Sequence, residues 1–329
     1  MSDVHSFVFE GLPVRGILVR VTEAWQEILR RRAANSEHGP YPAPVSKMLG
    51  EMVAAGALMQ ANIKFDGALT LQIMGDGPVK LAVVEVQSDL ALRATATVLS
   101  EVPVDAQLSA LVNAHNQGRC AITLDPQTKF PGQQPYQGVV PLFDDARRPI
   151  QRISEVLEHY MLQSEQLDTT LVLAANDTVA AGLLIQRLPI QGTANLAGSL
   201  VSRENEDEIG LNAHYERIAV LASSLQQEEL LTLDAHTILR RLFWEENLTL
   251  FDPAQPARQP HFACSCSRER VGRMIQGLGK EEADSILAER GEIEVACEFC
   301  GVQYPFDAID TAQLFVPPTQ SASGSQAAH

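Results

Sequence analysis

Hydrophobic positions recur with two different periods along the first two hundred residues. Short apolar or alternating segments, typical of strands, are residues 7–9, 69–73, 79–86, 90–98, 120–124, 138–142, 171–175 and 182–188. Apolar positions at helical spacing fall at residues 25–29, 45–61 and 150–161. Many strands with few helices between them predict an α+β domain that contains a largely antiparallel sheet.

The pattern changes near residue 207, where two helical stripes begin. Asp234 is placed as the N-cap of the second stripe. The following stretch, residues 252–260, contains three prolines and no apolar pattern, which is typical of a linker. We therefore expect an α+β domain at 1–206, a helical linker at 207–260, a compact cysteine module at 261–316 and a disordered polar tail at 317–329.

Composition and charge narrow the choice of partners. The chain has 329 residues, of which 45% are hydrophobic, enough to build a core. Its formal net charge of −16 disfavours nucleic acid and anionic membranes, because both attract surplus lysine and arginine. There is neither a basic segment followed by an apolar run at the N-terminus nor an apolar stretch near the ~18 residues of a membrane helix. We expect a cytoplasmic protein.

Four of the five cysteines lie close together in the sequence. They form two pairs, Cys264 with Cys266 and Cys297 with Cys300. Four thiolates in two close pairs suit one tetrahedral Zn²⁺ per chain, and the long intervening loop lets the pairs converge. A glycine directly after the second pair, Gly301, tolerates a positive φ that can direct backbone N–H groups at sulfur. His261 lies nearby, but the four thiolates already complete a ligand set.

Tetrahedral geometry links zinc binding to oxidation. With Zn–S near ~2.3 Å, neighbouring sulfurs lie roughly 3.8 Å apart, whereas a disulfide requires ~2.05 Å. A pair of these cysteines can therefore oxidise only by leaving the metal. A module of about 55 residues is near the limit of what its own core can stabilise, and structural zinc contributes ~10–16 kcal/mol in small peptides. The sequence permits an oxidation-triggered transition from order to disorder.

The cysteine module resembles a known family. The segments CSCSRER and DSILAERGEIEVACEFCGVQY are similar to the heat shock protein 33 family, the redox-regulated bacterial 33 kDa chaperonins. Upstream, YPAPVSKMLGEM, IKFDGALTLQIMGDGPVKLAVV, YQGVVPL and SEQLDTTL resemble its N-terminal domain, and LRRLFWEENLTLFDP resembles its linker. The resemblance covers about residues 5–315. The proline-rich stretch at 256–260 departs from the family pattern.

The resemblance implies a binding protein rather than an enzyme. Such proteins are inactive monomers while reduced and zinc-bound. Peroxide with mild unfolding stress, or hypochlorite, forms the disulfides Cys264–Cys266 and Cys297–Cys300 by analogy. Zinc then leaves, the switch and linker unfold, and the activated dimer holds unfolding client proteins without ATP. Reduction and transfer of the clients to ATP-dependent foldases end the cycle.

Two features of the sequence carry further hypotheses. Apolar residues on the linker stripes are candidate client contacts: Ile218, Leu221, Leu225, Ile238, Leu242 and Phe243. The alternative is that they face the core of the protein, and both hold if they are packed when reduced and exposed when oxidised. Cys120 lies outside the motif and is interpreted as a buried, inert strand cysteine, the alternative being a reactive thiol that joins subunits.

Two other functions remain open. The module could be a zinc ribbon with a structural metal that recruits a nucleic acid or regulatory partner, but residues 261–316 hold five basic and ten acidic side chains, whereas nucleic-acid modules show a basic face. A thiol oxidoreductase would place Cys297 and Cys300 at a helix start in a βαβ setting. Here they follow the strand-like segment EIEVA. The chaperone is the favoured interpretation.

Overall fold

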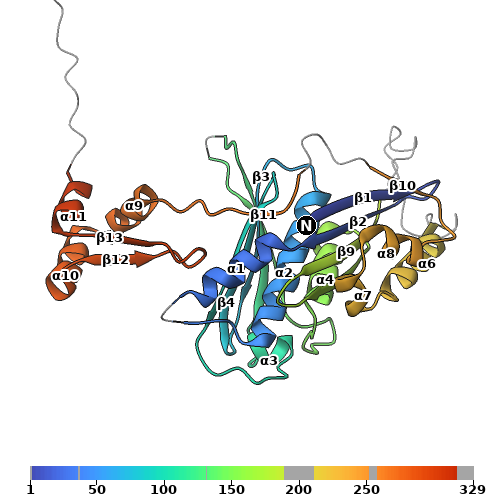
Figure 1. Ribbon diagram of the computed structural model, residues 1–329, viewed down its shortest axis with the longest axis horizontal. Helices are drawn as coiled ribbons and strands as arrows, with labels where there is room; N and C mark the ends of the chain where they lie inside the picture. Colours follow the sequence, from blue (N-terminus) through green and yellow to red (C-terminus); the bar gives the residue numbers. More distant parts are fainter. Residues whose placement is uncertain (1, 36–37, 131, 189–210, 252–257, 317–329) are drawn as a thin grey trace, which may run out of the picture. The chain divides into compact units, whose positions relative to one another are not determined.

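The computed structural model describes residues 2–35, 38–130, 132–188, 211–251 and 258–316 (Figure 1). The chain divides into two compact units, Met1–Ala263 and Cys264–His329. The predicted boundary at 206/207, residues 252–257 of the proline-rich stretch and the tail at 317–329 lie outside the described residues.

The first unit contains two sheets that confirm the α+β prediction. One is antiparallel throughout, in the order β10 (Leu248–Leu250), β1 (Asp3–Phe9), β2 (Val14–Val21), β9 (Ala180–Arg187) and β8 (Thr169–Ala175). The other runs β11 (His261–Phe262), β5 (Ala91–Val98), β4 (Val79–Gln87), β3 (Gly67–Met74), β6 (Arg119–Pro126) and β7 (Tyr136–Pro141). Within this second sheet, β11 pairs in parallel with β5 and the remaining pairs are antiparallel.

A central apolar helix joins the two sheets. Helix α2 (Ala43–Asn62) contacts β2, β8 and β9 of the first sheet and β3, β4 and β5 of the second. It is therefore buried along nearly its whole length, as its predominantly apolar sequence predicts. Gly56 allows this close approach, because a Cβ there would lie 3.1 to 3.2 Å from Val84 and Val86. Three further helices complete this layer: α1 (Glu23–Ala33), α3 (Leu108–Val112) and α4 (Ile153–Glu165).

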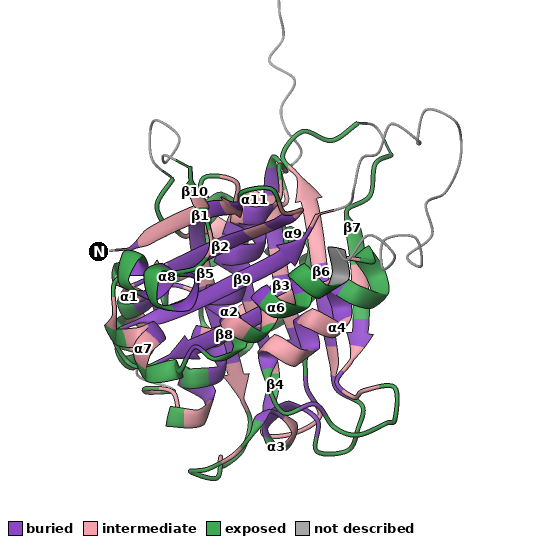
Figure 2. Ribbon diagram, turned by 90° about the vertical axis from the view of Figure 1, so that its right-hand side faces the viewer, coloured by how far each residue is buried: buried purple, intermediate pink, exposed green. Residues whose placement is uncertain are grey.

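The predicted linker helices pack on the other face of the five-stranded sheet. They are α6 (Leu211–Ser223), α7 (Gln227–Thr232) and α8 (Ala235–Leu242). Figure 2 shows their exposed outer sides in front of the buried strands β2 and β9. Asp234 caps α8 as predicted, since its side chain accepts the N–H of Thr237 at 3.0 Å. Arg20 of β2 donates to the carbonyls of Leu230 at 2.8 Å and Leu233 at 2.7 Å, so the sheet itself holds the end of α7.

The second unit is small and has little core. It comprises α9 (Arg268–Leu278), α10 (Lys280–Arg290), the antiparallel hairpin β12 (Ile293–Ala296) and β13 (Gln303–Phe306), and α11 (Ala308–Leu314). Its buried hydrophobic cluster consists of Ile275, Ala283, Ile293 and Phe306. Such a core leaves the unit dependent on additional stabilisation.

The unit boundary falls three residues after the predicted start of the cysteine module. Residues 261 and 262 form β11 and pair with β5, so they belong to the first unit. Within the described residues, no helix is both long enough and apolar enough to cross a bilayer.

Candidate metal centre

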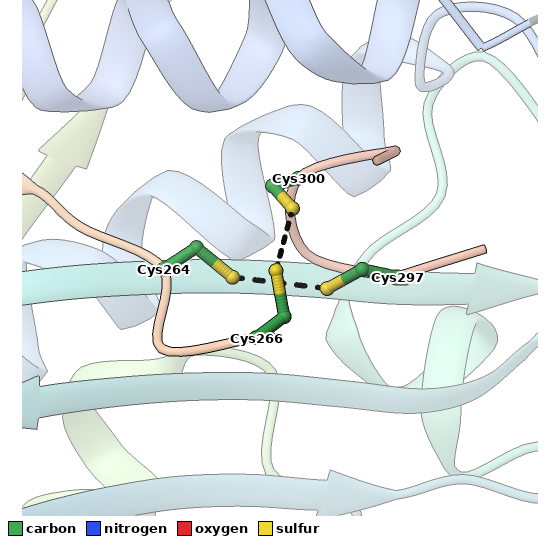
Figure 3. Close-up of side chains that lie close together, drawn as sticks. All are labelled: Cys264, Cys266, Cys297 and Cys300. Atoms are coloured by element: carbon green, nitrogen blue, oxygen red, sulfur yellow. Dashed lines mark hydrogen bonds between the residues drawn. The ribbon is translucent and has the colours of Figure 1, made fainter. Parts of the chain in front are cut away.

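The four predicted zinc ligands come from two segments of the second unit and meet at one point (Figure 3). Cys264 and Cys266 lie between β11 and α9, and Cys297 and Cys300 lie between β12 and β13. The sulfurs of Cys264 and Cys297 are 3.7 Å apart, and those of Cys266 and Cys300 are 3.3 Å apart. All four sulfurs lie within 4.8 Å of one another.

The first pair is positioned by the start of α9. Ser267 caps the helix, its side chain accepting the N–H of Arg270 at 3.2 Å. Arg270 in turn donates to the carbonyl of Ser265 at 2.9 Å and to its hydroxyl at 2.8 Å. The residue between the two cysteines is thus tied to the helix, which restrains the backbone that carries both cysteines.

The second pair is held by a tight turn. The N–H of Gly301 donates to the carbonyl of Cys297 at 2.8 Å, and the N–H of Cys297 donates to the carbonyl of Val302 at 2.9 Å. Gly301 has a φ of +71° and open space around a hypothetical Cβ. Glycine is therefore favoured there by backbone conformation rather than by crowding.

The cluster sets its sulfurs in different environments. Burial raises the pKa of Cys297 and of Cys300, although backbone N–H groups oppose it at both. Burial also acts on Cys266, but hydrogen bonds from the Tyr304 hydroxyl, at 3.1 Å, and from neighbouring sulfurs outweigh it and lower its pKa to about 7. Four gathered thiols that must ionise together call for a cation to compensate their charge.

The donor set fits a tetrahedral soft-metal site. Sulfur separations of 3.3 and 3.7 Å are close to the roughly 3.8 Å that Zn–S bonds of ~2.3 Å require. Four thiolates select zinc or an iron–sulfur centre over hard cations. His261 is not among the ligands: it is exposed, and its Nδ1 lies 3.0 Å from the carbonyl of Gln259. Tyr304 is the contact that sequence reasoning missed, because no motif spacing marks it.

The remaining candidate residues lie in the first unit. Cys120 on β6 is 1% exposed, and burial raises its pKa to about 12, in agreement with the interpretation as an inert strand cysteine. Of the six candidate client contacts, Leu221 is half-buried. The other five are buried in the core beneath the linker helices: Ile218, Leu225, Ile238, Leu242 and Phe243. They face the core in this state, and client contact stays a prediction.

Comparisons with known proteins by sequence and by structure point to one family. A family model described as "Hsp33 protein" matches residues 2–307. A 33 kDa chaperonin of Chromobacterium violaceum is 42% identical over 314 residues, which cover 95% of this chain and 94% of that protein. One of Methylobacillus flagellatus is 41% identical over 317 residues, covering 96% and 95%. A crystal structure of the 33 kDa chaperonin (Heat shock protein 33 homolog) from Thermotoga maritima matches with a TM-score of 0.68 at 22% identity, over 94% of this chain and 97% of that one, and shows a shared fold.

Proposed function

The chain belongs to the Hsp33 family of chaperones, and from this membership we propose that it is a redox-switched holdase that works without ATP. The observation that carries the proposal is the gathering of four cysteine sulfurs in a unit whose hydrophobic cluster has four buried residues among those described. A unit of this kind is ordered by its metal, so chemistry at the ligands decides whether it stays folded.

The proposed switch is a thiol oxidation. In the reduced protein, Cys264, Cys266, Cys297 and Cys300 hold one Zn²⁺ as thiolates, and the bound ion supplies charge compensation and a fixed tetrahedral geometry. Each disulfide forms when two thiolates lose two electrons to an oxidant. With hydrogen peroxide, two protons are taken up and two waters are produced for each disulfide. Two disulfides remove all four thiolate ligands.

The disulfides proposed from the family are Cys264–Cys266 and Cys297–Cys300. The shortest sulfur contacts run between these pairs instead, from Cys264 to Cys297 and from Cys266 to Cys300. The local pairing is still favoured once the unit loosens, because closing a loop of one or two residues restricts an unfolded chain less than closing a loop of about thirty. Peptide mapping without reduction distinguishes the two pairings.

The proposed consequence is exposure of apolar surface. When the second unit unfolds, the chain after β11 loses its order, and the linker helices α6, α7 and α8 then leave the sheet. Their packed residues and the sheet face beneath them become available to unfolding clients. Activation is proposed to produce a homodimer in the cytoplasm and to end with transfer of the clients to ATP-dependent foldases. The protein acts by binding rather than by catalysis.

The test couples three measurements on the same samples. Zinc content, free thiols and suppression of aggregation of a thermally unfolding protein are followed before and after mild peroxide at raised temperature. We expect one zinc to leave as four thiols disappear, and suppression to appear only then. A Cys120→Ala variant is the control and should respond like the wild type. Zinc that stays bound while activity never changes would identify a structural zinc module and refute the switch.

A further inference from the structure

The strand β11 is the last element of the first unit and covers the edge of the six-stranded sheet. It runs parallel to β5. The N–H of His261 donates to the carbonyl of Leu90 at 3.2 Å, and the N–H of Ala263 donates to the carbonyl of Leu92 at 3.1 Å. A strand of two residues is short even for a sheet edge, so it is an element that can detach.

The side chain of Phe262 packs beneath Arg31 into a contact site on this edge, which is called the seat of Phe262. It is half-buried and packs against the large core of the first unit. The guanidinium carbon of Arg31, on α1, lies 4.6 Å from the ring centroid, within the range of a cation–π contact. Glu27 orients Arg31 through a 2.7 Å bond to its Nε. The edge therefore offers both backbone acceptors and an aromatic seat.

The surroundings of the seat are acidic. A cavity of about 640 Å³ beside β11 is lined by Glu23 and Asp89, by Glu27, whose charge is paired with Arg30 and Arg31, and by His261 of β11 itself. A basic side chain next to the aromatic residue suits this charge, and the chain's own sequence places histidine before phenylalanine there. The segment that the edge accepts is thus extended, aromatic and basic.

The edge of β5 is covered beyond the reach of β11. The chain leaves β5 at Cys264 to enter the second unit. By the alternation of a strand, the backbone of Ala94 faces the same side as Leu92, but Ala94 is only 1% exposed and is thus already covered. Two residues further, the hydroxyl of Tyr41 accepts the N–H of Ala96 at 2.8 Å and closes the edge. The edge therefore accepts a strand about as long as β11.

Chain connectivity couples β11 to the metal centre. Ala263 is followed directly by Cys264. While the second unit is folded, the chain after β11 is already ordered. Once that unit unfolds, keeping β11 paired also costs the conformational entropy of the neighbouring backbone. Two hydrogen bonds and one half-buried ring must then offset this cost. The pairing of β11 with β5 weakens when the cysteines oxidise.

We propose that this edge of β5, covered by β11 while the metal centre is intact, binds an extended segment of an unfolded client that carries an aromatic residue next to a basic one. Backbone pairing with β5 supplies affinity and the seat beneath Arg31 supplies specificity, as in other cases of strand addition. The inference rests on the proposed holdase function and assigns it a client-binding edge.

The probe is a fluorescein-labelled synthetic peptide, ARQPHFAS, which repeats residues 257–263 and ends in serine. Its anisotropy measures binding to the full chain. The tethered Phe262 competes with the peptide, so we expect reduced, zinc-loaded Phe262→Asp to bind at least tenfold more tightly than reduced wild type. Oxidised wild type should also bind more tightly than reduced wild type. Unchanged zinc content and protected thiols show that the variant is folded, and a peptide with aspartate for phenylalanine should not bind.

Two arginines on the same helix provide a matched pair. In the Phe262→Asp background, Arg31→Ala should weaken peptide binding about threefold to fivefold, the size of an exposed cation–π contact. Arg30→Ala is the control, because Arg30 also bonds to Glu27, at 2.7 Å, but does not contact the seat. Equal binding by the two arginine variants, or no gain from Phe262→Asp, would overturn the assignment.

The two proposals fail separately. If oxidised wild type suppresses aggregation while the peptide binds no better to Phe262→Asp, the client edge is wrong and the holdase function stands. If the peptide binds as expected but oxidation never produces suppression of aggregation, the edge is a peptide site and the holdase function is wrong.

Discussion

At the scale of single residues, Glu51 shows how burial alone can make stability depend on pH. This carboxyl lies on α2 beside a cavity of about 660 Å³. Burial raises its pKa to about 7, and the nearby charges of Lys47 and Arg152 oppose the shift only in part. In the unfolded chain the same group titrates near 4.5, so between these values the folded state binds the extra proton.

The pH dependence of unfolding tests this description. Because the folded pKa is the higher one, the free energy of unfolding should fall as pH rises from about 4.5 to 7. Glu51→Gln should remove this fall and stabilise the protein at pH 8 by at most about 3 kcal/mol. Urea unfolding followed by tryptophan fluorescence, to which Trp25 in the same core contributes, measures both. Glu101→Gln, at an exposed position, is the control. An unchanged slope in Glu51→Gln would contradict the assignment.

Cys120 differs from the other cysteines in its reactivity. Its pKa of about 12, raised by burial from 9.0, leaves about a thousandfold less thiolate than an exposed cysteine has near pH 8. In reduced protein freed of zinc, iodoacetamide should modify the four module cysteines rapidly and Cys120 only after urea is added. Mass spectrometry of the peptides measures the rates. Rapid labelling of Cys120 in folded protein would favour its alternative role as a reactive thiol.

At the scale of elements, the linker helices are part of the folded first unit. Ile218 of α6 is fully buried, whereas Val220 on the same helix is 70% exposed. Ile218→Asn should weaken the packing of the linker by about 3 kcal/mol, because it removes apolar contacts and buries an amide. Val220→Asn should change stability by less than about 0.5 kcal/mol.

Limited digestion of the reduced, zinc-loaded protein distinguishes these two variants. Trypsin should cleave at Arg217 and Arg241 much faster in Ile218→Asn than in Val220→Asn or wild type. If such loosening also produces suppression of aggregation without oxidation, release of the linker is sufficient for activity. Equal digestion of both variants would mean that the linker is not held by its packed stripe.

The sequence predicted the elements in which one hydrophobic period dominates and missed elements that lack such a period. The alternating strands and the apolar helix at 45–61 were recognised because one period dominates each. The strand β2 was not predicted: it lies between β1 and β9 with most of its residues buried, so it lacks alternation. Helix α10 was missed for the opposite reason, since it buries only Ala283.

The metal centre was predictable because its ligands lie in two pairs that are close together in the sequence. Two close pairs of cysteines need no knowledge of the fold to suggest a tetrahedral site. The contacts that shape the site depend on the folded structure instead. Tyr304 of β13 donates a hydrogen bond to Cys266 in the segment before α9, and Arg270 of α9 donates to the carbonyl of Ser265. The parallel pairing of β11 likewise joins segments about 170 residues apart.

At the scale of the whole molecule, stability is distributed unequally between the two units. The first has two extensive cores, and the second has one hydrophobic cluster with four buried residues among those described. A structural zinc ion contributes ~10–16 kcal/mol in small peptides, as much as the entire stability of a typical domain. Removal of the metal should therefore unfold the second unit while the core around α2 in the first unit stays folded.

Hydrogen exchange after chelation tests this division without any oxidation. A strong zinc chelator is added to the protein in the presence of a reductant, so that no disulfide can form. Amides of residues 264–316 should then exchange within seconds, while those of α2 should keep the protection they have in the zinc-loaded protein. Retained protection in residues 264–316 would show that the small core suffices by itself. Oxidation would then have to act through the strain of its disulfides, because loss of the metal would leave the unit folded.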